Sequence, residues 1–482
     1  MKILFATSEV HPLIKTGGLA DVSGSLPIAL KTLGHDIRIL LPAYSSVLEK
    51  ITHKKIICRI KLAGYPEEIN ILEYTLPNTT LIVYLVDAPT YFNRPGKPYT
   101  TPDGYDWIDN ADRFTLFSKI AATIALNQTQ IEWQPDIVHA NDWQTGLIPA
   151  LLATEESRPG TLFTIHNLAY QGLYSYDTFK HLNLPQHLWS MHSMEFHGQL
   201  SFIKGGLTLA DKITTVSPTY AREIKTSEYG YGLQKLLRQR SVDLTGIING
   251  VDYSIWNPED DPHIKHNYSH DNLENKVLNK RAIQQHFNLP ETDVPMLSFI
   301  GRLVDQKGVN LILHALPKLL ESPVQIVLLG SGDLYYEEEL NKIKQQAPDK
   351  LALLIGYDEE LAHLIQAGSD MLLMPSKYEP CGLNQLYSLK YGTIPIVRRT
   401  GGLVDTVIDT SPRSIKHNTA TGFIFDESDH RSLTAIILKA KHYYTDKKDV
   451  WNQLIINAMK QDYSWEISAI EYVDLYEQAL IF

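Results

Sequence analysis

The feature that most constrains the fold of this chain is a repeated alternation of short, continuously apolar runs with longer amphipathic stretches. Met371–Met374 is one such run; it stops at Pro375 and is followed by a helical pattern from Gly382. Ile394–Val397 begins a second copy of this order. Continuous apolar runs of this length are typical of parallel strands buried on both faces, and their alternation with helices favours βαβ units. The sequence therefore predicts an α/β protein built on doubly wound parallel sheets.

The same alternation divides the chain into two parts. About six predicted strands precede a turn at Asn249-Gly250, and a second series of strands follows it. We therefore expect two Rossmann-like domains that face each other across a cleft, a usual place for a ligand. The N-terminal domain is predicted over 1–248 and the C-terminal domain over 249–457. A helix over 458–482 is expected to pack back onto the first domain.

Composition argues against several classes of protein. A net charge of −11 argues against non-specific nucleic-acid binding. The two cysteines, Cys58 and Cys381, cannot form a disulfide framework, so a reducing compartment is expected. The first apolar run ends too early for a signal peptide, and no apolar stretch of about 18 residues predicts a membrane span. We expect a cytoplasmic protein without nucleic-acid or membrane partners.

A lysine and two glycines separate the first predicted strand, Ile3–Thr7, from the first helix. Lys15, Gly17 and Gly18 precede Asp21 in this turn. Glycines permit close backbone approach to a phosphate, and both the lysine and the helix N-terminus favour an anion. A tight turn with a solvated lysine explains the pattern equally well.

Two further polar residues of the first half follow predicted strands. Asp142 and His166 lie where open α/β sheets bind ligands, just past the carboxyl ends of the strands. Earlier in the chain, the irregular loop Tyr91–Asn110 is rich in aromatic residues, which suit the C–H faces of sugar rings. The alternative is that these aromatic rings only anchor the loop to its own domain.

The second half carries cations, an acid and paired glycines in the same kind of turn. Arg302 and Lys307 follow a predicted strand and could neutralise a diphosphate, or could be a solvated pair of charges. Glu379 follows the strand named first. Two arginines and two glycines follow the next strand; they are Arg398, Arg399, Gly401 and Gly402. The two turns together indicate a site for a phosphate-bearing sugar.

Taken together, these residues resemble the starch and glycogen synthase family. The matching motifs keep one order over nearly the whole chain, and the ordered set is far more specific than any one of them. In chain order they are Lys15-Thr16-Gly17-Gly18-Leu19-Ala20-Asp21-Val22, His139-Ala140-Asn141-Asp142-Trp143, Ile165-His166-Asn167-Leu168-Ala169-Tyr170-Gln171-Gly172, Ser217-Pro218-Thr219-Tyr220-Ala221, Asn249-Gly250-Val251-Asp252, Gly301-Arg302, Gln306-Lys307-Gly308, Glu379-Pro380-Cys381-Gly382-Leu383 and Arg398-Arg399-Thr400-Gly401-Gly402-Leu403.

The resemblance implies a GT-B fold and a retaining transfer of glucose from ADP-glucose to the non-reducing 4-OH of an α-1,4-glucan. It implies no metal and no cofactor. Two alternatives stay open: a glucosyltransferase of the same fold that uses UDP-glucose, and a glucan-binding protein without catalysis. The phosphate-binding cations disfavour the second alternative, because a glucan binder has no need of them.

The resemblance also assigns residues to roles. Those expected to act on the transferred glucose or the leaving phosphate are Glu379, His166, Lys15, Arg302 and Lys307. Those expected to bind substrate are Lys15, Gly17, Gly18, Asp21, Asp142, Asn249, Tyr357, Cys381, Gly382 and Leu383. Asp142 and Asn249 would bind sugar hydroxyls or the acceptor, and Tyr357 would lie near the adenine.

Three features of the Glu379 region qualify the resemblance. Retention by way of Glu379 is compatible with double displacement and with internal return. Tyr387 stands where the wider retaining GT-B group often has a glutamate that contacts ribose, and Asn384 stands where a threonine is expected. Arg398 and Arg399 are expected to be structural or to contact the acceptor, because Arg302 and Lys307 already account for the diphosphate.

Overall fold

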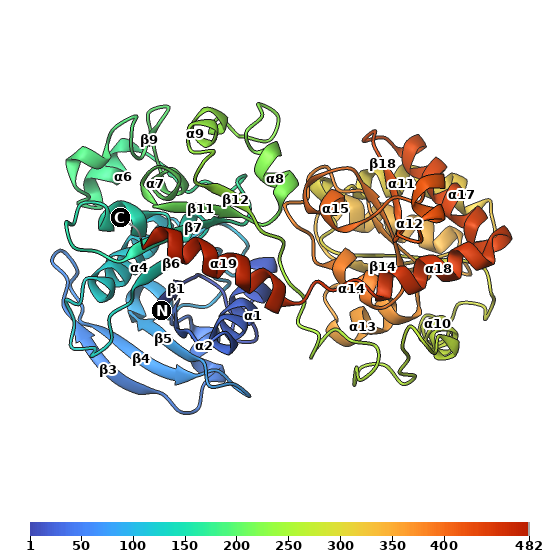
Figure 1. Ribbon diagram of the computed structural model, residues 1–482, viewed down its shortest axis with the longest axis horizontal. Helices are drawn as coiled ribbons and strands as arrows, with labels where there is room; N and C mark the ends of the chain where they lie inside the picture. The colour runs from blue at the N-terminus through green and yellow to red at the C-terminus, as the bar shows by residue number, and fades with distance from the viewer. Residues whose placement is uncertain (481–482) are drawn as a thin grey trace. The chain divides into compact units, whose positions relative to one another are not determined.

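The computed structural model describes residues 1–480 and forms two compact units. Unit 1 comprises Met1–Gly250 and the C-terminal segment from Trp465, and unit 2 comprises Val251–Ser464. Each unit is built on a large sheet of its own (Figure 1). No helix in the described part of the chain is long and apolar enough to cross a membrane.

Unit 1 contains a nine-stranded sheet in the order β12-β11-β7-β6-β1-β2-β5-β4-β3. The strands from β12 to β5 pair in parallel, whereas β4 and β3 form an antiparallel edge. The predicted parallel sheet thus carries an additional antiparallel edge, where one-sided burial permits antiparallel pairing. The strand bounds are β1 Lys2–Ala6, β2 Asp36–Pro42, β3 Lys55–Ile60, β4 Ile69–Thr75, β5 Ile82–Asp87, β6 Ile137–Asn141, β7 Gly160–Ile165, β11 Lys212–Thr215 and β12 Leu244–Gly246. A small sheet adds β8 Leu173–Tyr174, β9 Glu195–Phe196 and β10 Gln199–Ser201.

Several helices of unit 1 pack against this large sheet, and the last of them comes from the end of the chain. The bounds are α1 Gly18–Thr32, α2 Ser45–Lys50, α3 Pro89–Phe92, α4 Asn110–Ala125, α5 Leu147–Leu152, α6 Tyr176–His181, α7 Phe202–Leu209, α8 Pro218–Glu223, α9 Gln234–Gln239 and α19 Trp465–Ala479. Figure 1 shows α19 in red among the blue and teal elements of unit 1. It is held there partly by His139 of β6, whose Nδ1 lies 2.8 Å from the Tyr476 hydroxyl.

The predicted helix over 458–482 differs from what the structure contains. Its first residues end α18 in unit 2, and α19 begins only at Trp465. The reason is local, because Ser464 pairs with Val251 in a β-bridge and donates its N–H to Asp462. The last two predicted residues, 481–482, lie outside the described part of the chain.

Unit 2 contains a six-stranded parallel sheet in the order β15-β14-β13-β16-β17-β18. The strand bounds are β13 Met296–Ile300, β14 Gln325–Gly330, β15 Leu351–Ile355, β16 Met371–Met374, β17 Ile394–Arg398 and β18 Phe423–Phe425. The helices are α10 Glu274–His286, α11 Val309–Leu320, α12 Leu334–Gln346, α13 Glu359–Gly368, α14 Asn384–Lys390, α15 Gly401–Thr406, α16 Pro412–Lys416, α17 His430–Asp446 and α18 Lys448–Met459.

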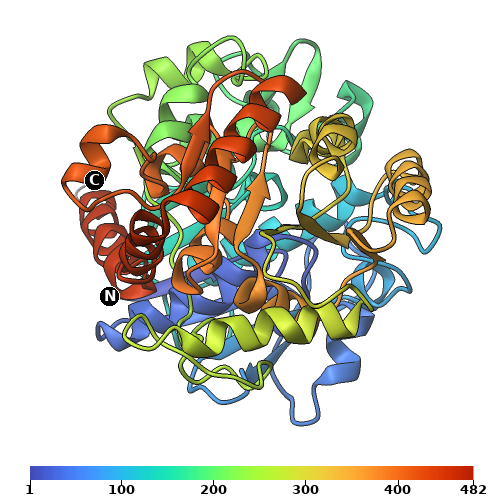
Figure 2. The ribbon, with the colours of Figure 1, turned by 90° about the vertical axis from the view of Figure 1, so that its right-hand side faces the viewer.

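Helices cover both faces of this second sheet (Figure 2). Along β13, Leu297 and Phe299 pack into the core shared with α11 and α17, whereas Met296 packs into the core shared with α10 and α13. Alternate residues of a strand point to opposite faces, so a strand buried on both faces must be apolar throughout. This explains the continuous apolar runs of the sequence.

Each large sheet has one point at which the strand order reverses. In unit 1 the chain runs from β1 to β2 on one side and later places β6 on the other side. In unit 2 it runs from β13 to β14 on one side and later places β16 on the other. Open α/β sheets bind ligands beyond the carboxyl ends of the strands at such switch points. The loops that follow these strands are therefore the candidate sites.

Candidate functional site

Asp142 follows β6 directly, at the switch point of unit 1. Its backbone has φ 60° and ψ −178°, a conformation that costs a residue other than glycine about 1–3 kcal/mol. Its buried Oδ1 accepts the backbone N–H groups of His166 at 2.7 Å and Asn167 at 3.3 Å. Burial raises the pKa of Asp142 to about 7, against the effect of these two hydrogen bonds. The structure thus holds a strained acid with a near-neutral pKa at a strand end.

His166 lies beside Asp142 and is a neutral imidazole. Its Nε2 lies 2.9 Å from Oδ1 of Asn141, whose Nδ2 donates to the Ala6 carbonyl at 3.1 Å. This orientation of the amide places the imidazole proton on Nε2. Loss of water around the ring lowers the pKa of His166 to about 3. The structure therefore brings the predicted residues Asp142 and His166 together, with the ring unprotonated above pH values of about 5.

The Lys15 turn is organised by an acid that the sequence interpretation missed. Glu9 is 3% exposed, and its carboxylate accepts the backbone N–H groups of Thr16 at 2.5 Å and Gly17 at 3.2 Å. Lys15 Nζ pairs with Asp21 Oδ1 at 2.7 Å, so these two predicted residues also lie together. The Gly17 N–H is thus already bonded within the protein, and approach of this turn to a phosphate stays a prediction. The sequence signal that could have identified Glu9 is an acidic residue just past the first predicted strand.

The aromatic loop 91–110 is largely anchored to unit 1. Tyr99 donates its hydroxyl to Glu9 Oε1 at 2.5 Å and packs against Phe114, and the Arg94 guanidinium lies 5.1 Å from the centroid of the Trp107 ring. Tyr105 is 76% exposed. Anchoring therefore explains most of these rings, and Tyr105 is left available to solvent.

Asn249 lies at the end of unit 1 and is buried with its Oδ1 lacking a hydrogen-bond partner among the described residues. Buried amide oxygens of this kind are usually paired. The unpaired oxygen is consistent with the predicted contact to a sugar hydroxyl, which stays a prediction.

At the switch point of unit 2, Lys307 and Glu379 form an ion pair. Lys307 Nζ lies 2.6 Å from Glu379 Oε2, which also accepts the Ser376 hydroxyl at 2.9 Å. The Glu379 side chain is 7% exposed and that of Lys307 22%. Arg302 is exposed and donates to Gln306 at 3.3 Å, while Gln306 donates to the Tyr378 carbonyl at 3.1 Å. Three predicted residues from two loops are thus connected around one carboxylate.

The helix expected to begin at Gly382 begins instead at Asn384. Gly382 has φ 76°, which a right-handed helix excludes, and so it lies in the preceding loop. The Asn384 amide donates to the Ile300 carbonyl at 2.7 Å, which ties this helix to the end of β13 just before Arg302. Cys381 is buried, and Leu383 precedes the helix.

Tyr387 packs inside unit 2. Its ring stacks on Trp256 at 4.0 Å between centroids, and Trp256 stacks in turn on His363 at 3.8 Å. Tyr357, by contrast, is 70% exposed beyond β15. Only Tyr357 of these two tyrosines is placed to offer a ring to a ligand.

Arg398 and the paired glycines, Gly401 and Gly402, contact the backbone of the loop that carries Glu379. Arg398 is buried and donates to the carbonyls of Ser376, at 2.8 Å, and Lys377. A Cβ at Gly401 would lie 1.9 Å from the Glu379 carbonyl oxygen, so only glycine fits there. Arg399 is half-exposed and pairs with Asp426. The interpretation of this turn as a phosphate site is therefore replaced by a structural role for Arg398 and Gly401.

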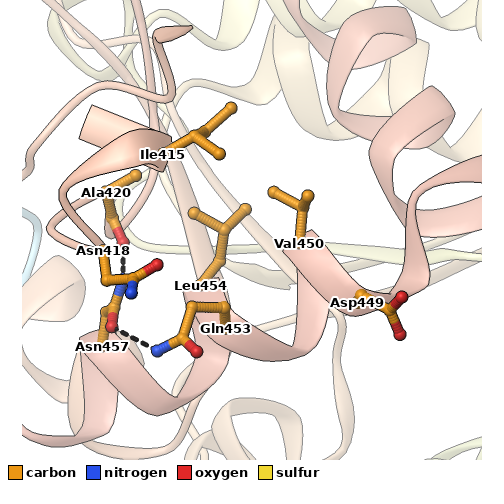
Figure 3. A pocket seen from close by; sticks show the side chains of 8 residues that line it. All are labelled: Ile415, Asn418, Ala420, Asp449, Val450, Gln453, Leu454 and Asn457. Carbon is orange, nitrogen blue, oxygen red and sulfur yellow. Dashed lines mark hydrogen bonds between the residues drawn. The ribbon is translucent and has the colours of Figure 1, made fainter. Parts of the chain in front are cut away.

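Two cavities lie away from these loops. One of about 220 Å³ is lined by residues of α16 and α18 and by the segment after α16 (Figure 3). Within it Gln453 donates to Asn457, and Asn457 donates to the Ala420 carbonyl. Another of about 390 Å³ lies among residues 191–240 of unit 1. Neither is lined by a predicted site residue, and the described residues contain no metal-binding cluster of three or more histidine, cysteine or acidic side chains.

Comparison with known proteins gives full-length matches. The family model of the starch synthase catalytic domain matches residues 2–239, and that of glycosyl transferases group 1 matches residues 280–458. A glycogen synthase of Thioalkalivibrio sulfidiphilus is 51% identical over 480 residues, which cover 99% of both chains. A glycogen synthase of Cellvibrio japonicus is 54% identical over 479 residues, which cover 98% of both chains.

Solved structures agree with these matches. The catalytic domain of starch synthase IV from Arabidopsis thaliana, bound to ADP and acarbose, has a TM-score of 0.90 and 33% identity over 99% of each chain. A sucrose-phosphate synthase from Thermosynechococcus elongatus, 17% identical with a TM-score of 0.60, shares the fold. The predicted GT-B fold with two Rossmann-like domains is confirmed.

Proposed function

This chain belongs to the glycogen and starch synthase family of glycosyltransferases, and from that premise we propose that it elongates an α-1,4-glucan with ADP-glucose. Glucose would pass to the non-reducing 4-OH with retention of configuration. The observation that carries the proposal is the Lys307–Glu379 pair at the switch point of unit 2. The ADP bound to the Arabidopsis starch synthase supports an adenine nucleotide over UDP.

In unit 2 we assign Glu379 to the transferred glucose and Lys307 with Arg302 to the diphosphate. An ammonium group has three donors, so Lys307 can keep Glu379 on one and offer the others to phosphate oxygens. The leaving ADP gains negative charge in the transition state, which fixed cations stabilise. The buried Glu379 carboxylate would stabilise positive charge at the anomeric carbon. Cys381, Gly382, Leu383 and Tyr357 are proposed substrate contacts.

In unit 1 we assign Lys15 to the donor phosphate and Asp142, His166 and Asn249 to sugar hydroxyls. A neutral His166, whose Nε2–H is taken by Asn141, offers Nδ1 as an acceptor and does not act as an imidazolium acid. The turn residues Gly17, Gly18 and Asp21 are proposed to complete the donor contacts. A cytoplasmic location and activity without a metal ion also stay predictions.

The test is a glucosyl-transfer assay on glycogen with ADP-glucose and, separately, UDP-glucose. We expect transfer from ADP-glucose, abolished in Glu379→Ala and reduced in Lys15→Ala through a higher donor KM and a lower kcat. Lys180→Ala is the matched control, because Lys180 also pairs with an aspartate in unit 1 but is exposed and distant in the chain from the turn. Faster transfer from UDP-glucose would reverse the donor assignment. Glycogen binding without transfer from either donor would establish the glucan-binding alternative.

A further inference from the structure

Glu9 is a buried acid whose carboxylate accepts four hydrogen bonds. Oε2 accepts the N–H groups of Thr16 and Gly17 at 2.5 and 3.2 Å. Oε1 accepts the hydroxyls of Thr16 and Tyr99, each at 2.5 Å. None of the ion pairs found among residues 1–480 includes Glu9, and Lys15 directs its charge to Asp21. The carboxylate is therefore held by four neutral donors from two separate segments.

These contacts fix the backbone that follows Lys15. The N–H groups of Thr16 and Gly17 both donate to Oε2 of Glu9, and this fixes the orientation of the two peptide planes that follow Lys15. The direction of the Lys15 side chain depends on this part of the backbone. Gly17 is the N-cap of α1 and has no side chain with which to cap it. Glu9 places a negative charge beside that helix N-terminus, where it is favourable. The turn thus takes its order from Glu9 rather than from its own residues.

Glu9 also connects this turn to its surroundings. Through Tyr99 it reaches the aromatic loop 91–110, and Tyr99 is itself bonded to Ser8 at 2.8 Å. The negative charge of Glu9 adds to burial in raising the pKa of Asp142, so the two carboxyl groups lie close enough to interact. One buried acid therefore lies among the turn, the loop and the end of β6.

We propose that Glu9 is a positioning residue, whose carboxylate holds the Lys15 turn in the conformation that binds the donor phosphate. The inference rests on the proposed function, since it takes Lys15 as the donor contact. Glu9 acts through Lys15 and need not touch the substrate. Its removal should therefore lower donor affinity much more while Lys15 is present than in its absence.

The experiment measures donor KM, kcat and thermal unfolding of Glu9→Ala, Glu9→Gln and the double variant with Lys15→Ala. Asp211→Asn is the matched control, because Asp211 accepts the N–H and hydroxyl of a single threonine, Thr161, as Glu9 does with Thr16. A hydrogen bond to a charged group corresponds to about tenfold in an equilibrium constant. We expect Glu9→Ala to raise donor KM about tenfold or more, and Asp211→Asn to leave it within about twofold.

Glu9→Gln should recover donor KM to within about threefold of the wild type. Its amide oxygen can accept the two N–H groups, and its NH₂ can donate to the hydroxyls of Thr16 and Tyr99, which also act as acceptors. In the Lys15→Ala background, Glu9→Ala should add less than about twofold, because residues that act as a unit are non-additive. Should Glu9→Ala fail to fold, Glu9→Asp withdraws the carboxylate by one carbon–carbon bond and should raise donor KM in the same direction.

Two results would overturn the inference. Additive effects of Glu9→Ala and Lys15→Ala would show that Glu9 does not act through the turn. A lower donor KM in Glu9→Ala would show that the carboxylate competes with phosphate for the same N–H groups. If the wild type transfers glucose from neither donor, the proposed function fails. The same double-mutant cycle, read by calorimetric ADP binding, then still decides whether Glu9 supports Lys15.

Discussion

Asp142→Asn is expected to stabilise the protein at pH 8 and to leave its stability nearly unchanged at pH 4. Burial raises the pKa of Asp142 from 3.8 to about 7, so the folded state binds this proton more tightly than the unfolded chain. The stability contributed by the protonated carboxyl is complete below about pH 4 and is lost as the pH rises through 7. Asparagine stays neutral and keeps an oxygen for the N–H groups of His166 and Asn167.

The magnitude follows from the two pKa values. The difference between 3.8 and about 7 corresponds to about 4 kcal/mol of unfolding free energy, since each tenfold in proton affinity is worth about 1.4 kcal/mol. The advantage of Asp142→Asn should therefore grow from near zero at pH 4 to at most about 4 kcal/mol at pH 8.

The assay is urea unfolding of wild type and variants at pH 3, 4, 6 and 8, with Asp211→Asn as a control of opposite sign. Burial alone would raise the pKa of Asp211, but hydrogen bonds from Arg158 and Thr161 lower it. Asp211→Asn should therefore be less stable than the wild type at pH 8, and this deficit should shrink as the pH falls below 4. A stability difference for Asp142→Asn that stays constant from pH 4 to 8 would refute the reasoning. We also expect this variant to transfer glucose more slowly.

Three further predictions concern the two sites. Glu379→Gln should lower kcat about 100-fold or more with little change in the unfolding midpoint, because it removes a charge where the transition state is stabilised. Gly401→Ala should lower the unfolding midpoint, since its Cβ would lie 1.9 Å from the Glu379 carbonyl oxygen. Gly17→Ala should leave the unfolding midpoint unchanged, because no atom outside the neighbouring residues lies within 4 Å of its Cβ. It should raise donor KM, because the added methyl group occupies space at the proposed donor contact. Arg398→Ala should lower the free energy of unfolding by about 1.5–3 kcal/mol and reduce kcat. Arg399→Ala loses only an exposed ion pair and should lower the free energy of unfolding by less than about 1 kcal/mol. Parallel transfer assays and thermal scans check all three.

The buried elements of unit 2 were the most predictable part of the fold. The predicted run Met371–Met374 has the bounds that the structure shows, and the predicted run Ile394–Val397 is one residue shorter than β17. Each run is buried along its length, so its continuous apolar sequence is enough to locate the strand. The antiparallel strands β3 and β4 were missed because edge strands carry polar residues on their exposed face. The start of the C-terminal helix was misplaced because a bridge from Ser464 to Val251, far away in sequence, precedes it.

The candidate site was predictable in residue type but not in pairing. Strand-end position alone pointed to Glu379, Lys307, Asp142 and His166. That Lys307 pairs with Glu379 depends on β13 lying beside β16, which the local sequence does not encode. Glu9 was missed for the same reason, since its donors come from later segments of the chain.

The stack of His363, Trp256 and Tyr387 has an evolutionary consequence. A glutamate at position 387, as in the wider retaining GT-B group, would leave one face of Trp256 without its partner ring and bury a charge in its place. Tyr387→Glu should therefore lower the unfolding midpoint, and it should lower it by less in a background where Trp256 is already replaced by alanine. Positions 256 and 387 are thus epistatic. A lineage that replaced Tyr387 by glutamate would therefore change its stability by an amount that depends on the residue at position 256.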